Sequence, residues 1–362
     1  MMGMKDFREK NRAFYKGKRV LLTGHTGFKG SWLTAILHYL QAETMGYALE
    51  PDAGCLFERI HGDTMIRSVC GNLSDQARLE RAIQEFQPEI VLHLAAFGFV
   101  KECYEAPVQA YETNLMGSLH LLEALRKCSS VRSVVMVSTD KVYENLGDGA
   151  NYKETDRLGG TGPYSGSKTC MEYLIQDYRE TYFLTQEKKV GLAAVRASNV
   201  LGGGDHVQSR LIPTILRSAA EGKPVAIRNP NQTRPWQYVL DALNGYLSVA
   251  RLLYQEPAAY SEAWNIGPKK DGIRSVGWIF EAINCAFHIM EKPNGNGIGV
   301  AESQTLGLDI QKSLERLDWE PILPIEQTIG KVVEFFNRQK AGEDEREICM
   351  QQINEFYGGQ AK

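Results

Sequence analysis

The sequence predicts an α/β fold, with a doubly wound parallel sheet and a smaller, partly interleaved C-terminal lobe. Short apolar runs of strand length alternate with helical stretches through the first two hundred residues. Strands this apolar are typical of parallel sheets that helices cover on both faces. After Arg196 the pattern changes, because glycine and proline recur at short intervals and favour shorter elements.

The expected elements alternate in chain order. We expect strands at residues 19–23, 44–48, 90–94, 134–138 and 191–196, and helices at 27–40, 79–86, 108–127 and 164–183. A last amphipathic helix places five apolar residues on one face, namely Ile325, Ile329, Val332, Val333 and Phe336.

These elements suggest a division of the chain. The sheet domain is expected to comprise residues 1–198 with about 234–265, and the lobe residues 199–233 and 266–340. Residues 341–362 form a charged tail, whose apolar residues at near-helical spacing are interpreted as a surface helix (Ile348, Met350, Ile353 and Phe356).

Composition narrows the functional classes. The chain has 362 residues, 43% of them hydrophobic and 23% charged, and a net charge of -3. This balance favours neither a nucleic acid nor a membrane surface as partner, and no apolar run is long enough to span a bilayer. The N-terminus has no signal-peptide pattern. Seven widely spaced cysteines without a Cys-x-x-Cys pair argue against disulfides and a metal site, so we expect a cytoplasmic protein.

A glycine-rich turn follows the first expected strand. Gly24, Gly27 and Gly30 are spaced three apart, with Thr26, Phe28 and Lys29 between them. Glycine lets the backbone approach a pyrophosphate, and the helix that starts here offers free N–H groups to it. The turn therefore predicts a dinucleotide site. No acidic residue stands clearly at the end of the second strand, which leaves NAD or NADP open.

Two further motifs carry chemistry. Tyr164 and Lys168 lie four residues apart, so a helix places both on one face. A nearby ammonium lowers the pKa of a phenol, which can then take a proton from a substrate hydroxyl. Thr139, Asp140 and Lys141 follow the strand at residues 134–138, at the sheet edge where ligands bind. A hydroxyl and a carboxyl there offer a hydrogen bond and a proton donor.

The chain resembles the nucleotide-sugar 4,6-dehydratases of the extended short-chain dehydrogenase/reductase family, in particular their CDP-glucose branch. The resemblance runs from about residue 18 to residue 338, and it is carried by residues 24–32, 114–124, 138–143, 159–168, 196–205, 210–213 and 227–239. It implies a Rossmann-type sheet, NAD as cofactor and a CDP-hexose as the favoured substrate. It also implies a homodimer that forms through the helices at 108–127 and 164–183.

The resemblance implies a mechanism. The hexose is oxidised at C4, loses water across C5 and C6, and receives the hydride back at C6. Tyr164 takes the proton of the 4-hydroxyl, Thr139 hydrogen-bonds that oxygen, and Lys168 supports Tyr164. Asp140 protonates the departing 6-hydroxyl. Lys141 assists loss of the C5 proton, either as a base or by stabilising the enolate, since free lysine is protonated at neutral pH.

The resemblance also assigns binding residues. Asn72, Leu73, Ala95, Ala96 and Asn114 join the glycine turn, Tyr164 and Lys168 in holding the cofactor. Asn199 and Arg234 hold the substrate pyrophosphate, Arg210 is a weaker candidate for this task, and Lys101 lies in the loop that borders nicotinamide and sugar. That loop departs from relatives, which typically continue after Ala96 with glutamine, proline, leucine, valine and arginine, whereas this chain has Phe97-Gly98-Phe99-Val100-Lys101.

Three hypotheses remain open on these residues. The first is a CDP-hexose 4,6-dehydratase. The second is another NAD(P)-dependent nucleotide-sugar enzyme, an epimerase or a dehydratase with a different nucleotide or hexose. The third is a dinucleotide-binding protein without catalysis, since a fold does not fix a function. The joint presence of Thr139, Asp140, Tyr164 and Lys168 argues against the third.

Overall fold

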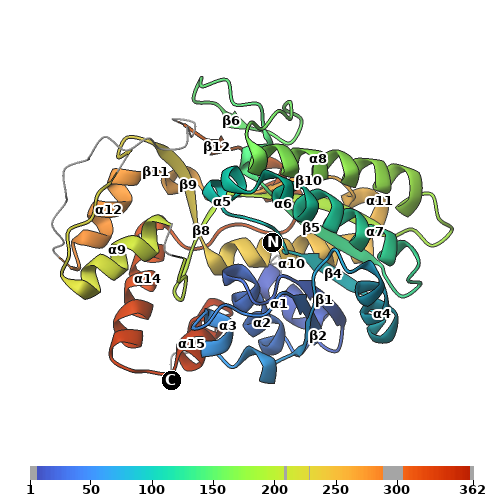
Figure 1. The fold of residues 1–362 in the computed structure, drawn as a ribbon, viewed down its shortest axis with the longest axis horizontal. Helices are drawn as coiled ribbons and strands as arrows, with labels where there is room; N and C mark the ends of the chain where they lie inside the picture. The colour runs from blue at the N-terminus through green and yellow to red at the C-terminus, as the bar shows by residue number, and fades with distance from the viewer. Residues whose placement is uncertain (1–5, 208–209, 228, 288–304, 359–362) are drawn as a thin grey trace, which may run out of the picture.

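A seven-stranded parallel sheet forms the centre of the computed structural model, which describes residues 6–207, 210–227, 229–287 and 305–358. The strand order is β10-β7-β5-β4-β1-β2-β3, and every neighbouring pair is parallel (Figure 1). The expected doubly wound sheet is confirmed. Its strands are β1 (Arg19–Thr23), β2 (Glu43–Ala48), β3 (Arg67–Cys70), β4 (Ile90–His93), β5 (Ser133–Thr139), β7 (Gly191–Ala197) and β10 (Ala263–Ile266).

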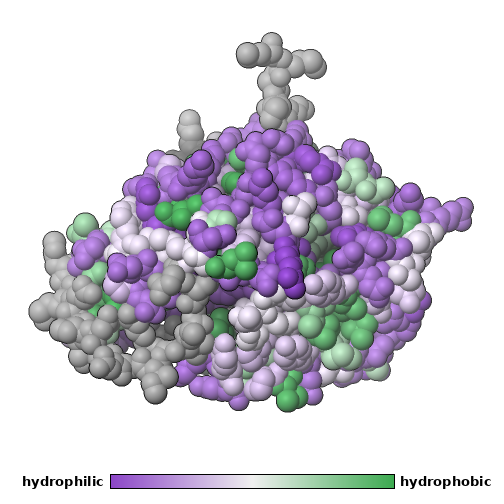
Figure 2. Space-filling view, turned by 90° about the horizontal axis from the view of Figure 1, so that it is seen from above, coloured by the Kyte–Doolittle hydropathy of each residue, from purple (hydrophilic) through white to green (hydrophobic). Residues whose placement is uncertain are grey.

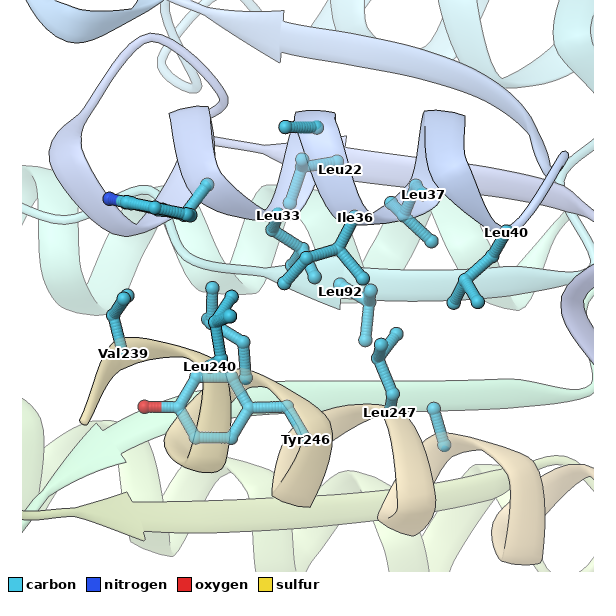
Figure 3. Packing of buried hydrophobic residues seen from close by; sticks show 14 of the residues in the cluster. Leu22, Leu33, Ile36, Leu37, Leu40, Leu92, Val239, Leu240, Tyr246 and Leu247 are labelled. Carbon is cyan, nitrogen blue, oxygen red and sulfur yellow. The ribbon is translucent and has the colours of Figure 1, made fainter. Parts of the chain in front are cut away.

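Helices cover both faces of this sheet because successive side chains of each strand point to opposite faces. Leu22 packs in one apolar core and its neighbour Leu21 in the other. Figure 3 shows Leu33 and Ile36 of one covering helix facing Leu240 of another. The first face carries α1 (Phe7–Tyr15), α2 (Phe28–Tyr39), α10 (Val239–Gln255) and α15 (Glu345–Phe356), and the second carries α4 (Gln76–Phe86), α7 (Gly117–Arg126) and α8 (Pro163–Tyr178).

The C-terminal helix α15 corrects an expectation. A surface helix was expected here, but Ile348, Cys349, Ile353 and Phe356 are buried in the same core as α2. Only Met350 remains partly exposed among the apolar residues of that stretch. The charged residues here resemble an exposed tail, but they form the start of α15. The Asp344 side chain accepts a hydrogen bond from the Arg346 N–H group.

Both long expected helices exist, but each contains a wider π-helical turn. The helix expected at 108–127 consists of α6 (Pro107–Tyr111), a π turn at Glu112–Met116 and α7. The helix expected at 164–183 is α8 followed by a π turn at Arg179–Phe183. Such turns commonly mark functional positions. The first one carries Asn114 into the protein interior, where its side chain is fully buried.

A second lobe is built on a three-stranded sheet with the order β11-β9-β8. Its members are β8 (Asn199–Leu201), β9 (Thr233–Tyr238), β11 (Ile273–Ser275), α9 (Leu211–Glu221), α12 (Val276–Asn284) and α14 (Ile325–Lys340). On α14, Phe335 is fully buried, whereas the expected Phe336 is half-buried against Phe287. Because the chain returns to the large sheet as β10, the lobe is interleaved with it. The domain limits remain a prediction, and their ranges include residues 1–5, 208–209, 228, 288–304 and 359–362, which lie outside the described part.

Short elements complete the fold. They are α3 (Leu56–Arg59), α5 (Val100–Glu105), α11 (Pro257–Tyr260), α13 (Gln311–Arg316) and the parallel pair β6 (Asn151–Tyr152) with β12 (Gly307–Leu308). Within the described residues, no helix is both long and apolar enough to cross a membrane. The face seen from above is mainly hydrophilic, with apolar residues in small separate patches (Figure 2).

The strand order reverses between β1 and β4, and this reversal positions the site. Chain segments leave these neighbouring strands toward different sides of the sheet, and the carboxyl ends of strands at such a reversal are where open α/β sheets bind ligands. The turn after β1 begins at Gly24, and the turn after β4 contains Ala95. The two turns touch, because a side chain on Gly24 would come within 2.6 Å of the Ala95 nitrogen.

Candidate active site

The glycine turn has the geometry of a cradle for a dinucleotide. Gly24 has φ +73°, a conformation that favours glycine, and a side chain on Gly30 would collide with the Gly24 carbonyl. Helix α2 begins at Phe28, so the N–H groups of its first turn have no partner within the helix. The Phe28 side chain is buried in the core and leaves only its backbone for a ligand. Thr26 donates a hydrogen bond to the Leu49 carbonyl at 3.3 Å.

The far end of the cradle lies at the ends of β2 and β3. Asn72 is exposed there, and its side-chain oxygen accepts a hydrogen bond from the Ser74 N–H group at 3.0 Å, whereas Leu73 is buried. Tyr47 points inward and donates to the Asn72 carbonyl at 3.1 Å. The acidic residue at this edge is Glu50. Burial raises the pKa of the Cys70 thiol to about 11, and the hydrogen bond and negative charge of the Glu50 carboxylate contribute to this rise.

The catalytic corner follows β5. Thr139 and Asp140 are 5% and 1% exposed, and the Thr139 hydroxyl lies 3.1 Å from Oδ1 of Asp140. The Lys141 ammonium is 3.8 Å from the same oxygen. Tyr164 lies in the first turn of α8, and its side chain is near Thr139. Burial raises the pKa of Tyr164 to about 12, while the Thr139 hydroxyl opposes the shift by favouring the phenolate.

Two lysines, the buried Lys168 and the half-buried Lys29, face this corner. Lys168 donates to the Val137 carbonyl at 3.0 Å, one helical turn beyond Tyr164. Burial, together with the positive charge of Lys29, lowers its pKa to about 7. Lys29 extends from the glycine turn to the Tyr246 hydroxyl at 3.5 Å, and burial lowers its pKa to about 8. The positive charge of Arg210 also lowers the pKa of Lys29, whereas the negative charge of Asp140 opposes this change.

The loop after β4 is held by Asn114. Its side-chain oxygen accepts from the Phe97 N–H group at 2.8 Å, and its nitrogen donates to the Phe97 carbonyl at 3.1 Å and to Ser167 at 3.0 Å. Asn114 thus links the loop after β4 to α8 through its bonds to Phe97 and Ser167. Ala95 and Ala96 precede the loop and present only methyl groups. Their direct contact with a cofactor stays a prediction.

The structure places three of the four predicted substrate residues in the second lobe. Asn199 lies half-buried on β8, and Arg234 is 3% exposed on β9. Arg210 is held by an ion pair to Asp205 at 2.9 Å, and its guanidinium lies 5.1 Å from the ring centre of Phe99. Lys101 is not brought to the others: its side chain is 73% exposed and pairs with Glu105.

Sequence reasoning missed a buried network behind the catalytic corner. Arg196 of β7 makes two hydrogen bonds of 3.0 Å to Glu172 of α8. It also donates to the Tyr143 hydroxyl at 2.9 Å, and Tyr143 donates to Asn265 of β10 at 2.6 Å. The network ties the helix of Tyr164 to the turn of Asp140. Its one sequence signal is Glu172, four residues after Lys168 and thus on the same helical face.

The fold and this site define a class: an NAD-dependent enzyme of the short-chain dehydrogenase/reductase type, with a nucleotide cradle and a tyrosine–lysine pair. Residues 20–267 match the "NAD dependent epimerase/dehydratase family", and the chain belongs to that family.

Curated relatives narrow the comparison. A CDP-glucose 4,6-dehydratase of Salmonella typhimurium is 39% identical over 96% of this chain and 98% of its own length. A dTDP-glucose 4,6-dehydratase of Xanthomonas campestris is 28% identical over 87% of this chain and 92% of its own. The chain is thus similar to dehydratases along almost its whole length.

Solved structures confirm the fold. A dTDP-glucose 4,6-dehydratase of Bacillus anthracis in complex with NAD has a TM-score of 0.74 at 23% identity, and covers 90% of this chain and 98% of its own. A UDP-glucose 4-epimerase of Thermotoga maritima has the same TM-score at 22% identity, and covers 89% and 99%. Because epimerases and dehydratases share this fold, the choice of reaction depends on the side chains.

Proposed function

We propose that this chain is an NAD-dependent nucleotide-sugar 4,6-dehydratase that converts CDP-glucose to CDP-4-keto-6-deoxyglucose. The observation that carries the proposal is Asp140, a buried carboxyl beside Thr139 and Tyr164. One oxygen of this carboxyl, Oδ2, has no hydrogen-bond partner among the described residues. An epimerase needs only the hydroxyl at this corner, whereas elimination of water needs a proton donor. The relative that is 39% identical supports cytidine as the nucleotide.

In the proposed reaction, each residue of the catalytic corner has a separate role. When bound, NAD supplies a reversible hydride acceptor at the nicotinamide. Tyr164 takes the proton of the 4-hydroxyl, and Thr139 orients that oxygen. The ketone acidifies C5. Lys141 accepts the C5 proton, its positive charge then stabilises the enolate, and it returns a proton to C5 when the hydride reaches C6. Asp140 then protonates the 6-hydroxyl, which leaves as water. Lys168 holds the tyrosine end of the site through its bond to the Val137 carbonyl.

Residues of the second lobe bind the diphosphate of the substrate. Asn199, Arg210 and Arg234 supply an amide and two guanidinium groups, which suit phosphate because arginine is always charged and donates in a planar fork. Lys101 lies in the first turn of α5 with its side chain 73% exposed, so its contact with the substrate stays a prediction.

A substrate panel tests the proposal. Purified holoenzyme is incubated with CDP-, dTDP-, UDP- and GDP-glucose, and products are weighed by mass spectrometry. Loss of one water from CDP-glucose, with a 4-keto product that absorbs in alkali, is the expected result. An unchanged mass with inversion at C4 would establish the epimerase instead. The matched control is Asp140→Asn, which abolishes dehydration and leaves C4 oxidation, visible as reduced cofactor.

We further propose a homodimer formed through α8 and the α6–α7 helix. Large apolar side chains remain exposed on these helices and on the adjoining α5: Tyr104, Val108, Tyr111, Met116, Tyr173 and Tyr182. Val108 is 69% exposed, and Val108→Glu is expected to convert a dimer into a monomer in light scattering. Leu146→Glu is the control, since Leu146 is 72% exposed but lies outside these helices. A wild-type monomer would contradict this proposal.

A further inference from the structure

The catalytic corner consists of two parts that the fold supports in different ways. Tyr164 and Lys168 lie on α8, a helix of 16 residues whose inner face is packed in the core of the sheet domain. Asp140 and Lys141 instead lie in one short turn of three residues, Asp140–Val142, that follows β5. The core holds α8 along its length, whereas the position of the turn depends on the residues that fasten its end.

The Tyr143 side chain fastens the end of this turn to the large sheet. Tyr143 directly follows the turn and is 2% exposed, and its hydroxyl is both an acceptor and a donor. It accepts a hydrogen bond from Arg196 of β7 at 2.9 Å, and it donates one to Oδ1 of Asn265 of β10 at 2.6 Å. The backbone adds a second attachment, because the Val142 carbonyl accepts from the Gly159 N–H group at 2.9 Å.

Both partners of the Tyr143 hydroxyl are themselves held in place. Arg196 makes two hydrogen bonds of 3.0 Å to Glu172 of α8. Asn265 is fully buried and donates to the Tyr152 carbonyl at 2.8 Å. The ring of Tyr143 also stacks on the ring of Tyr152, with their centres 5.2 Å apart. Because fixed groups hold this hydroxyl from two sides, the end of the turn has a defined position.

We propose that Tyr143 is a positioning residue for the elimination of water. In the proposed reaction, Lys141 accepts the C5 proton and Asp140 protonates the 6-hydroxyl, so elimination depends on the turn. Oxidation at C4 instead uses Tyr164 of the helix and Thr139 of the strand. Loss of the Tyr143 hydroxyl releases the turn, leaves the helix and the strand in place, and so slows elimination more than oxidation. This inference rests on the proposed dehydratase function and adds to it a residue whose hydroxyl is enclosed by protein groups.

The proportion of reduced cofactor during turnover separates the two steps. Tyr143→Phe keeps the stacked ring and removes only the hydroxyl. Because a displacement of about 1 Å can cost about 100-fold in rate, we expect the variant holoenzyme to dehydrate CDP-glucose about 10- to 100-fold more slowly than wild type. Reduced cofactor should accumulate, since oxidation proceeds while elimination lags. Deuterium at C5 of the substrate should slow the variant more than wild type, whereas deuterium at C4 should have no larger effect than in wild type.

Two further variants test the same attachment and its specificity. Asn265→Ala removes the acceptor of the Tyr143 hydroxyl and should raise the proportion of reduced cofactor as well. Tyr15→Phe is the matched control, because it removes a fully buried phenol hydroxyl that lies outside the catalytic corner and donates to the Leu247 carbonyl at 2.8 Å. It should lower Tm to a similar extent but keep the wild-type proportion of reduced cofactor. Cofactor content and thermal melting verify that each variant is folded.

The outcomes distinguish the positioning role from the function on which it rests. A wild-type proportion of reduced cofactor in Tyr143→Phe and Asn265→Ala, or equal slowing of both steps, would overturn the positioning role and leave the dehydratase standing. A wild-type enzyme that removes water from no nucleotide hexose would overturn the proposed function, and the role of Tyr143 with it.

Discussion

The buried pair between Glu172 and Arg196 permits a quantitative prediction about stability. Their side chains are 4% and 5% exposed and are joined by two hydrogen bonds of 3.0 Å. Glu172→Met leaves the guanidinium buried without its counter-charge, and loss of one partner of such a pair costs about 3–5 kcal/mol. Arg196→Met also removes the bond to Tyr143, so its cost is expected to be at least as large.

Thermal melting measures this cost. At about 2.1 cal/mol/K per residue, a chain of 362 residues has an unfolding entropy of about 0.8 kcal/mol/K. A loss of 3–5 kcal/mol therefore lowers Tm by about 4–6 °C. The control is Glu85→Met, which breaks an ion pair between side chains more than half exposed and should shift Tm by about 1 °C or less.

The double variant Glu172→Met/Arg196→Met decides whether the reasoning is right. Replacing both charges with apolar groups leaves no buried unpaired charge. The decrease in Tm of the double variant should therefore be smaller than the sum of the decreases of the two single variants. Strictly additive losses, or a Glu172→Met protein that melts with wild type, would refute the account of this network.

Three further predictions concern the site. Phe99→Leu removes the ring beneath Arg210 and should raise KM for the nucleotide sugar about three- to tenfold at unchanged kcat, whereas an equal effect in a protein that already carries Arg210→Ala would show that Phe99 acts elsewhere. Because burial lowers the pKa of Lys168 to about 7, the unfolded chain binds one more proton than the native protein between about pH 7 and 10, and native stability rises with pH across this window. Lys168→Met should therefore melt above wild type at about pH 6, with an advantage that shrinks toward about pH 9, and a difference independent of pH would contradict the sign. Gly24→Ala places a methyl group 2.6 Å from the Ala95 nitrogen and should reduce retained NAD in the purified protein, measured after denaturation, and full retention would exclude the cradle.

Local spacing was sufficient to predict much of the sheet domain. Alternating apolar runs indicated its strands, because a strand buried on both faces must be apolar throughout. The glycine spacing indicated the turn, since Gly24 and Gly30 leave no room for a side chain. Tyr164 and Lys168 were linked by helical periodicity alone. These features depend on neighbours within a few residues, so the order of the residues already contains them.

Contacts between distant segments were decided only by the tertiary structure. Arg196 of β7 finds its partner Glu172 on α8. Lys29 of α2 contacts Tyr246 of α10, and Arg210 of the second lobe contacts Phe99. The sequence of α15 has the pattern of a surface helix although its apolar face is buried in the core. Periodicity shows which side of a helix is apolar, but it does not show which part of the protein packs on that side. These pairings join β7 to α8, α2 to α10 and the second lobe to the loop after β4, so they depend on how the sheet, its covering helices and the lobe pack together.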